Sequence, residues 1–340
     1  MSHQGYRAES HVANRRPAGD AVGGEAPESR AWALAYAAAK AVGGFDAERP
    51  ARFVLQEGGR LHPAAAAVAA DLLWNPRHGW QAPGAQAAGA QAAGALLDLY
   101  LPISSATACR PMTLAHLGQS LDGFIATPSG DSLFVTGPEN ILHLHRLRAL
   151  CDAVVVGAGT VSADNPRLTT RLVAGTNPVR VVLDPACRLS PALAVFSDQQ
   201  ARTLRVCAAG RARAQVPGEE LLEVAADGAG LNLADLLRAL RARGYQRVLI
   251  EGGGVTVSSF LRAGLLDRLH IAVAPVLIGE GRPSVRLPPQ ARLRDCLRLR
   301  HRVYRSGDDL LFDCDLRAPL EARASGERAG ASGGAFQRVL

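Results

Sequence analysis

The chain is basic, yet it has almost no lysine and few aromatic residues. Its net charge is +7, and Lys40 is the only lysine, so nearly all the positive charge comes from arginine. Aromatic residues make up 5% of the sequence, too few for the stacked rings on which single-stranded nucleic acids bind. The arginines are spread along the chain, which is typical of a solvated surface. We therefore expect no nucleic-acid partner, whereas anionic small molecules remain compatible with the charge.

Long apolar runs, paired cysteines and several catalytic motifs are also missing. No run approaches the ~20 residues of a membrane span, and residues 1–20 lack the apolar centre of a signal peptide. We therefore expect a cytoplasmic protein with no membrane partner. The six cysteines contain no C-x-x-C pair, so we expect buried thiols and no metal site. A Walker-type phosphate loop and a G-x-S-x-G elbow are absent too.

The composition divides the chain of 340 residues into four parts. Polar, low-complexity sequence at 1–29 and 319–340 predicts disordered ends. Residues 30–105 are rich in alanine and predict a small helical N-terminal region of unknown role. Residues 106–318 contain the alternating pattern of an α/β domain.

Within the N-terminal region we expect helices and no chemistry. One helix is predicted at 30–42 and a second at 64–74, after a proline that suits a helix start. Residues 83–95 predict a linker or a weak helix, and 96–101 would complete the helical unit. Trp32, Trp74 and Trp80 are expected to pack this unit rather than to bind a cofactor.

From Pro111 onward, strands alternate with helices. Strands are expected at 112–119, 152–160, 177–184, 204–206, 221–224, 248–250 and 269–276, with helices at 141–150 and 233–242. The last two strands, 296–304 and 309–315, predict a hairpin. This order favours an α/β fold with a mainly parallel central sheet, helices on both faces and an antiparallel C-terminal edge.

Two of the expected strands end in glycine turns, GAGT (157–160) and EGGG (251–254). A strand that passes through glycine into a helix directs free backbone N–H groups and the positive helix end at one place, which suits a diphosphate. A purely structural turn explains either glycine cluster equally well. Because parallel sheets bind ligands at the carboxyl ends of their strands, the two turns would face one cleft if their strands are neighbours.

The stretch DNPRLTTR (164–171) follows the first turn too closely for another full helix, so we expect a loop at the mouth of the cleft. An arginine there could clamp a phosphate. The alternative is that Asp164 caps a turn and Arg171 is merely exposed.

Other polar residues favour structural roles. Asp122 in SLDG is expected to cap its turn. His143 and His145 lie two residues apart on a predicted helix, so they would face different directions and form a poor metal pair. His116 could face the cleft, although a core histidine is the more common outcome.

Six segments together resemble a known family. They are LGQSLDGFIA (117–126), SGDSLFVTG (129–137), LRALCDAVVVGAGTVSADNPRLTTR (147–171), NPVRVVLD (177–184), VLIEGGG (248–254) and APVLIGEG (274–281). Their order is that of the C-terminal reductase domain of the bacterial bifunctional riboflavin-biosynthesis deaminase-reductase. This domain is a dihydrofolate-reductase-like pyrimidine reductase. The resemblance implies a homodimer that uses NADPH to reduce 5-amino-6-(5-phosphoribosylamino)uracil, with hydride transfer to C1′ of the ribosylamino group.

The resemblance also implies which residues form the site. At the cofactor it places Gln119, Phe134, Thr160, Asp164, Gly253, Gly254 and Val255, to which the two glycine turns add Gly157 and Gly252. At the substrate it places Ser132, Arg148, Leu168, Arg171 and Glu251. A proton must also reach the reduced group, and Glu251 and Asp164 are the candidate catalytic residues, although either could serve only to orient a ligand.

Three departures from the family pattern leave the substrate open. His116 stands where the family usually has lysine, Phe124 where it has a basic residue, and Phe134 where many members have tryptophan. One alternative is therefore the same fold and cofactor acting on another imine, a pterin-like compound or an aminopyrimidine. A second is a nucleotide-binding protein without turnover. The deaminase signature, H-x-E with P-C-x-x-C, is absent from the sequence.

Overall fold

The computed structural model describes residues 27–83, 91–133, 135–211, 219–228 and 230–317. The disorder predicted for the two ends falls mostly outside these residues. Residues 27–29 are an exception, because they form the first turn of helix α1 (Pro27–Ala41) and are not disordered. No helix in the described part of the chain is both long and apolar enough to cross a membrane.

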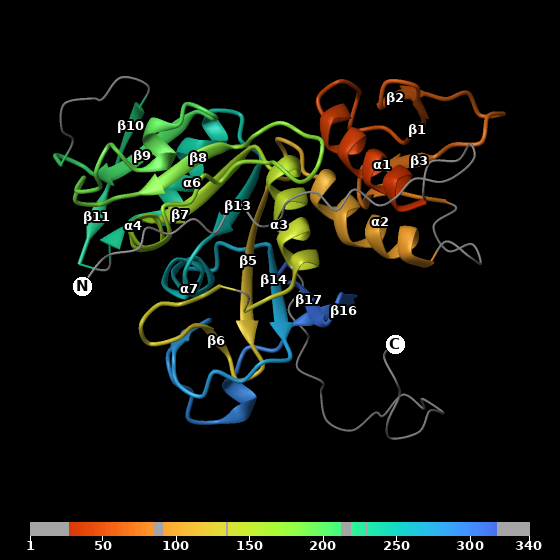
Figure 1. The fold of residues 1–340 in the computed structure, drawn as a ribbon. Helices are drawn as coiled ribbons and strands as arrows, with labels where there is room; N and C mark the ends of the chain where they lie inside the picture. The colour runs from red at the N-terminus through yellow and green to blue at the C-terminus, as the bar shows by residue number, and fades with distance from the viewer. Residues whose placement is uncertain (1–26, 84–90, 134, 212–218, 229, 318–340) are drawn as a thin grey trace, which may run out of the picture.

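A nine-stranded sheet forms the centre of the molecule (Figure 1). In spatial order its strands are β10 (Glu219–Val224), β9 (Thr203–Ala208), β8 (Val179–Leu183), β7 (Ala153–Gly157), β13 (Arg247–Glu251), β5 (Met112–Ser120), β14 (Arg268–Ala274), β17 (Asp309–Asp315) and β16 (Arg300–Ser306). All neighbours from β10 to β14 are parallel. The β16–β17 hairpin adds the antiparallel edge. The predicted sheet is therefore confirmed.

Successive side chains of the central strands enter two different cores, as the two-residue period of a strand requires. In β7, Val154 and Val156 belong to one core, and Ala153 and Val155 to the other. Helix α3 (Pro138–Leu150) packs in the first core. Helices α6 (Leu233–Ala242) and α7 (Gly254–Arg262) pack in the second, so helices cover both faces as predicted.

Residues 27–104, which we call the N-terminal unit, are only partly helical. Between α1 and α2 (Gln91–Ser104) lies an antiparallel sheet of four strands, β1 (Ala51–Gln56), β2 (Arg60–Pro63), β3 (Leu72–Asn75) and β4 (Gly79–Gln81). The helix predicted at 64–74 is therefore wrong. Its alanines favour a helix, but they supply no apolar face large enough to stabilise one. Leu72 and Trp74 instead point inward with the two-residue period of a strand.

The N-terminal unit shares a core with the sheet domain. Trp74 and Trp80 pack edge to face against each other and against Phe45, which confirms that tryptophans pack this unit. From α2, Tyr100 and Ile103 enter the same core as the α3 and β7 side chains. In Figure 1 the unit, drawn in red and orange, lies beside α3. One continuous core therefore crosses the expected boundary at residues 105 and 106.

Short elements complete the rim of the sheet. They are β6 (Phe124–Ala126), α4 (Ala158–Asp164), α5 (Ala194–Ser197), β11 (Ala226–Asp227), β12 (Gly230–Leu231), β15 (Arg282–Pro283) and a 3₁₀ turn at Leu293–Asp295. Strand β15 pairs with β6 and so brings residues 282–286 beside the carboxyl end of β5. The Asp122 carboxylate accepts hydrogen bonds from the N–H groups of Ile278 and Gly279, so its role is structural as expected, but these partners lie in a distant loop and not in its own turn.

All six cysteines have free thiols. Four are buried as expected, whereas Cys109 and Cys296 are exposed, so the prediction of buried thiols is wrong for these two.

Candidate functional site

A cavity of about 800 Å³ lies at the carboxyl ends of β5, β7, β8 and β13. Both glycine turns line it, as do the start of α3, the loop after α4 and residues 282–286. This is the place where an open parallel sheet binds its ligand.

The two glycine turns lie side by side. Their strands, β7 and β13, are hydrogen-bonded neighbours. The Gly253 N–H donates to Thr160 Oγ1 at 2.9 Å, which joins the second turn to the first. A Cβ placed on Gly157 would lie 2.5 Å from Thr256 Oγ1, so the first turn also contacts the helix that follows the second. The prediction that both turns face one cleft is confirmed.

The three glycines of the second turn are there for different reasons. Gly252 has φ of +135°, a conformation that L-residues rarely adopt. At Gly254 a Cβ would lie 1.9 Å from the carbonyl oxygen of Ser284. Gly253 has more room, since its Cβ would meet only Thr160 Oγ1 at 3.4 Å. The close approach at Gly254 is thus made by the protein's own backbone.

Each turn opens into a helix. Helix α4 follows Gly157 and α7 follows Gly253, and no side chain in the described part of the chain caps either start. The first-turn N–H groups of an uncapped helix are available to an anion. Helix α4 also corrects the loop expected at 164–171, because Asp164 is the last helical residue and the loop begins at Asn165.

The loop after α4 is held in a strained shape. Leu168 has φ of +55°, a left-handed conformation that costs a non-glycine residue about 1–2 kcal/mol. Its side chain is buried and lines the cavity. The Arg180 guanidinium donates to the Arg167 carbonyl oxygen at 3.2 Å, and Arg148 donates to that of Thr169 at 3.1 Å. Hydrogen bonds on both sides of Leu168 therefore fix it against the cavity.

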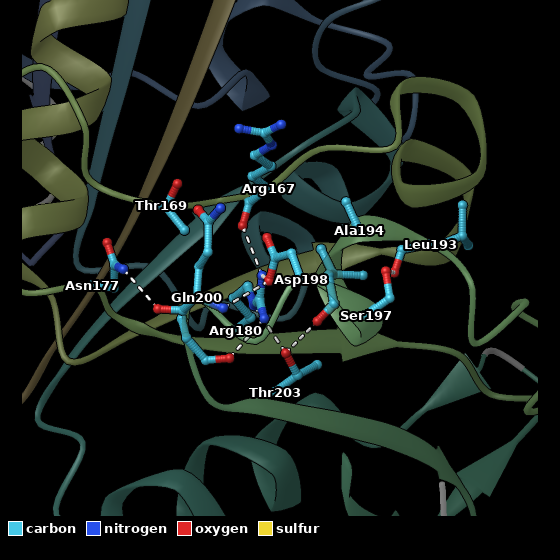
Figure 2. A network of polar contacts seen from close by, with 12 residues as sticks. Arg167, Thr169, Asn177, Arg180, Leu193, Ala194, Ser197, Asp198, Gln200 and Thr203 are labelled. Atoms are coloured by element: carbon cyan, nitrogen blue, oxygen red, sulfur yellow. Dashed lines mark hydrogen bonds and ion pairs between the residues drawn. The ribbon is translucent and has the colours of Figure 1, made fainter. Parts of the chain in front are cut away.

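Figure 2 shows how Arg180 supports this loop from the sheet. Its buried guanidinium also donates to Thr203 Oγ1 at 2.9 Å, to Asp198 Oδ1 at 2.7 Å and to the Ala201 carbonyl oxygen at 2.7 Å. These partners hold the arginine on β8 and β9, so the loop takes its position from the central sheet.

Glu251, at the end of β13, forms a buried ion pair with Arg148 of α3. Arg148 Nε donates to one carboxylate oxygen at 2.9 Å and Nη2 to the other. The side chains are 8% and 11% exposed, so water screens the pair little. Both arginine positions expected to bind phosphate, Arg148 and Arg171, lie outside the described cavity lining. Arg171 is exposed and donates to Thr169 Oγ1 at 2.7 Å.

Most other expected site residues line the cavity. They are Ser132, Gly157, Thr160, Asp164, Leu168, Glu251, Gly252, Gly253, Gly254 and Val255. Gln119 lies behind the wall, where its Oε1 accepts a hydrogen bond from Ser284 Oγ at 2.5 Å. Phe134 lies outside the described residues. The binding roles of all these residues stay predictions.

Sequence reasoning missed Asn140 and left His116 undecided. His116 is 5% exposed and lines the cavity, and its Nε2 lies 2.9 Å from Asn140 Oδ1. Burial lowers the pKa of His116 to about 4, so the imidazole is neutral near pH 7. Asn140 sits near the start of a helix, where asparagine is usually a surface residue, so nothing in its local sequence indicated this contact.

Two arginines at the rim of the cavity were also missed. Arg282 and Arg286 are exposed and line it from the segment that pairs with β6. They follow no strand–turn–helix pattern, and only tertiary pairing brings them to the site. Asp164 lies on the same rim, where partial desolvation raises its pKa and the Arg282 guanidinium acts against that rise. The cavity therefore has arginines and helix starts that can bind an anion along one wall, and beside them a carboxyl whose pKa is raised.

Comparison with known proteins agrees with this geometry. Residues 111–311 match the model of the RibD C-terminal domain family. A 2,5-diamino-6-ribosylamino-4(3H)-pyrimidinone 5′-phosphate reductase from Methanothermobacter thermautotrophicus is 34% identical over 211 residues, which cover 60% of this chain and 97% of that protein. The riboflavin biosynthesis protein RibD of Aquifex aeolicus is 34% identical over 173 residues, covering 51% of this chain and 48% of that protein.

A solved structure shows the same fold. The crystal structure of a diaminohydroxyphosphoribosylaminopyrimidine deaminase/5-amino-6-(5-phosphoribosylamino)uracil reductase from Thermotoga maritima has a TM-score of 0.54 at 28% identity. The match covers 68% of this chain and 62% of that one. This chain thus spans about half to two thirds of the bifunctional relatives and nearly all of the archaeal reductase.

Proposed function

This chain belongs to the RibD C-terminal domain family, and from that premise we propose that it is an NADPH-dependent reductase of riboflavin biosynthesis. Its substrate would be a phosphoribosylamino-pyrimidine, reduced at C1′ of the ribosylamino group. The observation that supports this most directly is the joining of two uncapped helix starts at one cavity by the Gly253–Thr160 hydrogen bond. That arrangement suits a dinucleotide better than a single small anion.

The residues of one cavity wall fit the cofactor. Backbone N–H groups at the starts of α4 and α7 would hold its diphosphate, and Arg282 and Arg286 would add positive charge at the rim. NADPH, when bound, supplies the hydride. The work of the protein is then to place the acceptor carbon, and positioning of this kind provides much of the rate in hydride transfer.

The opposite wall would position the pyrimidine and its sugar. Arg148 holds the Glu251 carboxylate in one orientation, and the lone pairs that remain can accept hydrogen bonds from ligand N–H or O–H groups. Leu168 would pack against the ligand from its strained loop. We assign Glu251 an orienting role, because both of its oxygens are already bound by Arg148.

Asp164 is the better candidate for the proton donor. Neither of its oxygens accepts a hydrogen bond from the residues that the structure describes, and partial desolvation shifts its pKa upward, in the direction that a proton donor needs. As a general acid it would make kcat fall as pH rises through its pKa in the enzyme–substrate complex. We expect Asp164→Asn to remove this limb of the kcat profile and Glu251→Gln to retain it. A limb that persists in Asp164→Asn would exclude Asp164 as the donor.

Turnover by the purified protein is the decisive experiment. NADPH oxidation should be followed with the aminouracil and with the 2,5-diaminopyrimidinone phosphate, the substrates named for the relatives, and the ribitylamino product identified by mass. We expect one of them to be reduced at 1 per second or faster, since typical enzymes reach about 1–10³ per second. Turnover of only a pterin or another imine would support the first alternative substrate class. Tight NADPH binding without any oxidation would support the non-catalytic alternative.

We also propose that the protein is a cytoplasmic homodimer, as the family resemblance implies. Light scattering at micromolar concentration tests the oligomeric state, and a monomer mass would exclude the dimer.

A further inference from the structure

Four buried ionisable residues form one chain of contacts that starts in the N-terminal unit. Tyr100 Oη lies 2.7 Å from His143 Nδ1, and His143 Nε2 lies 3.1 Å from His270 Nδ1. His270 Nε2 lies 3.2 Å from Asp313 Oδ1. None of the four is more than 3% exposed. They come from α2, α3, β14 and β17, so this series of contacts connects the N-terminal unit to the central sheet through α3.

One proton pattern fits all of these contacts. The Asp313 carboxylate, which also binds Arg268, can only accept, so a proton on His270 Nε2 suits the 3.2 Å contact between them, although this contact does not have hydrogen-bond geometry. His270 Nδ1 then accepts from His143 Nε2–H, and His143 Nδ1 accepts from the Tyr100 hydroxyl. Burial lowers the pKa of each imidazole, which favours the neutral rings that this pattern requires, although the Asp313 carboxylate acts against the shift at His270. The Tyr100 hydroxyl is therefore the donor that completes the chain.

Of the four residues in this series of contacts, His143 lies one helical turn from the cavity. Asn140 precedes His143 by three residues, so both lie on the same face of α3. Asn140 Nδ2 donates to Thr136 Oγ1 at 2.9 Å, which directs its Oδ1 toward His116 Nε2. His116 then presents Nδ1 as its unprotonated nitrogen. The rings of His116 and His143 are also in contact, with centroids 5.3 Å apart.

We propose that Tyr100 is a positioning residue for the cavity. By holding His143 it fixes the face of α3 that carries Asn140, and Asn140 in turn fixes the ring of His116 in the cavity wall. The N-terminal unit lies outside the matched family region at 111–311, and through Tyr100 it then helps to position the residues of the site. The effect on turnover rests on the proposed reductase function, but the effect on His116 does not.

Histidine ¹⁵N NMR of the full-length protein tests this without any assay of activity. In the native protein we expect His143 and His270 to carry their protons on Nε2; a proton on Nδ1 of either ring would overturn the proposal before any variant is made. In Tyr100→Phe, which keeps the aromatic ring, we expect the ring resonances of His143 and His116 to move. Unchanged His116 resonances in this variant would also overturn it.

Tyr36→Phe is the matched control. Tyr36 lies on α1 of the same unit, and its hydroxyl accepts a hydrogen bond from the Thr176 N–H, away from the histidines. We expect Tyr36→Phe to leave the His116 resonances and kcat/KM unchanged. We expect Tyr100→Phe to lower kcat/KM by about tenfold, equivalent to about 1.4 kcal/mol. If His116 responds to Tyr100→Phe while the native protein reduces no pyrimidine, the proposed function fails and the positioning role of Tyr100 stands. An equal loss of activity in both variants would show general damage to the unit and refute the specific role.

Discussion

Replacing Arg148 by methionine should destabilise the protein strongly, because it leaves the Glu251 carboxylate buried without a partner. The pair is bidentate and about nine-tenths buried, and Arg148 also donates to the Thr169 carbonyl oxygen. Removing one partner of a buried ion pair costs about 3–5 kcal/mol, and the additional hydrogen bond contributes about 1 kcal/mol. We therefore expect Arg148→Met to lower the free energy of unfolding by about 4–6 kcal/mol, a large part of the 5–15 kcal/mol typical of a folded protein.

A double-mutant cycle separates the pair from its surroundings. Arg148→Met combined with Glu251→Met removes both charges, and apolar replacement of a buried pair is often close to neutral. The double variant should therefore be more stable than Arg148→Met alone.

Urea unfolding followed by tryptophan fluorescence measures these differences. Arg202→Met is the control, since Arg202 binds Glu220 in an exposed pair at 3.0 Å, with side chains 71% and 43% exposed. Such a pair contributes about 0–1 kcal/mol. A loss in Arg148→Met no larger than in this control would refute the reasoning. It would mean that Arg148 is not paired with Glu251 in solution and is available to bind the substrate, the role that the family resemblance implies.

Two further predictions concern the cavity. A Cβ on Gly254 would meet the Ser284 carbonyl oxygen at 1.9 Å and displace the segment that carries Arg282, so Gly254→Ala should weaken NADPH binding in a fluorescence titration. Arg282→Gln should weaken it too and reduce its dependence on salt, and unchanged binding in both variants would exclude this wall as the cofactor site. The folded-state pKa of His116, about 4, lies below the unfolded value of about 6.5. The folded state therefore binds fewer protons, and stability should fall by up to about 3 kcal/mol as pH drops from 6.5 to 4. His116→Gln should flatten this part of the stability curve, and an equal slope in both proteins would contradict it.

The central sheet could be predicted from the sequence because its strands carry local signals. Residues 153–156 and 248–250 are short apolar runs, and in both segments glycine stands between the strand and the helix that follows. The neighbouring positions of the two turns also followed from a general rule, that parallel strands present their carboxyl ends at the same edge. Most of the residues that the family resemblance then named line the cavity.

What could not be predicted depends on pairing between distant segments. Arg148 and Glu251 are separated by 103 residues in the sequence. The sequence analysis therefore assigned both to substrate binding and did not pair them with each other. The sheet of the N-terminal unit was missed because its strands are short and the alanines between them favour a helix. Residues 282–286 reach the cavity only because β15 pairs with β6.

The core shared between α2, α3 and β7 limits how the protein can be shortened. The archaeal relative aligns over 211 residues, which makes a cut near residue 105 look like a simple way to obtain a minimal enzyme. Such a cut would expose to water the apolar side chains on this side of α3, among them Leu147 and Leu150. A truncated protein would need polar replacements on that face of α3 to stay in solution. Removing the N-terminal unit therefore also requires the surface of α3 to be redesigned.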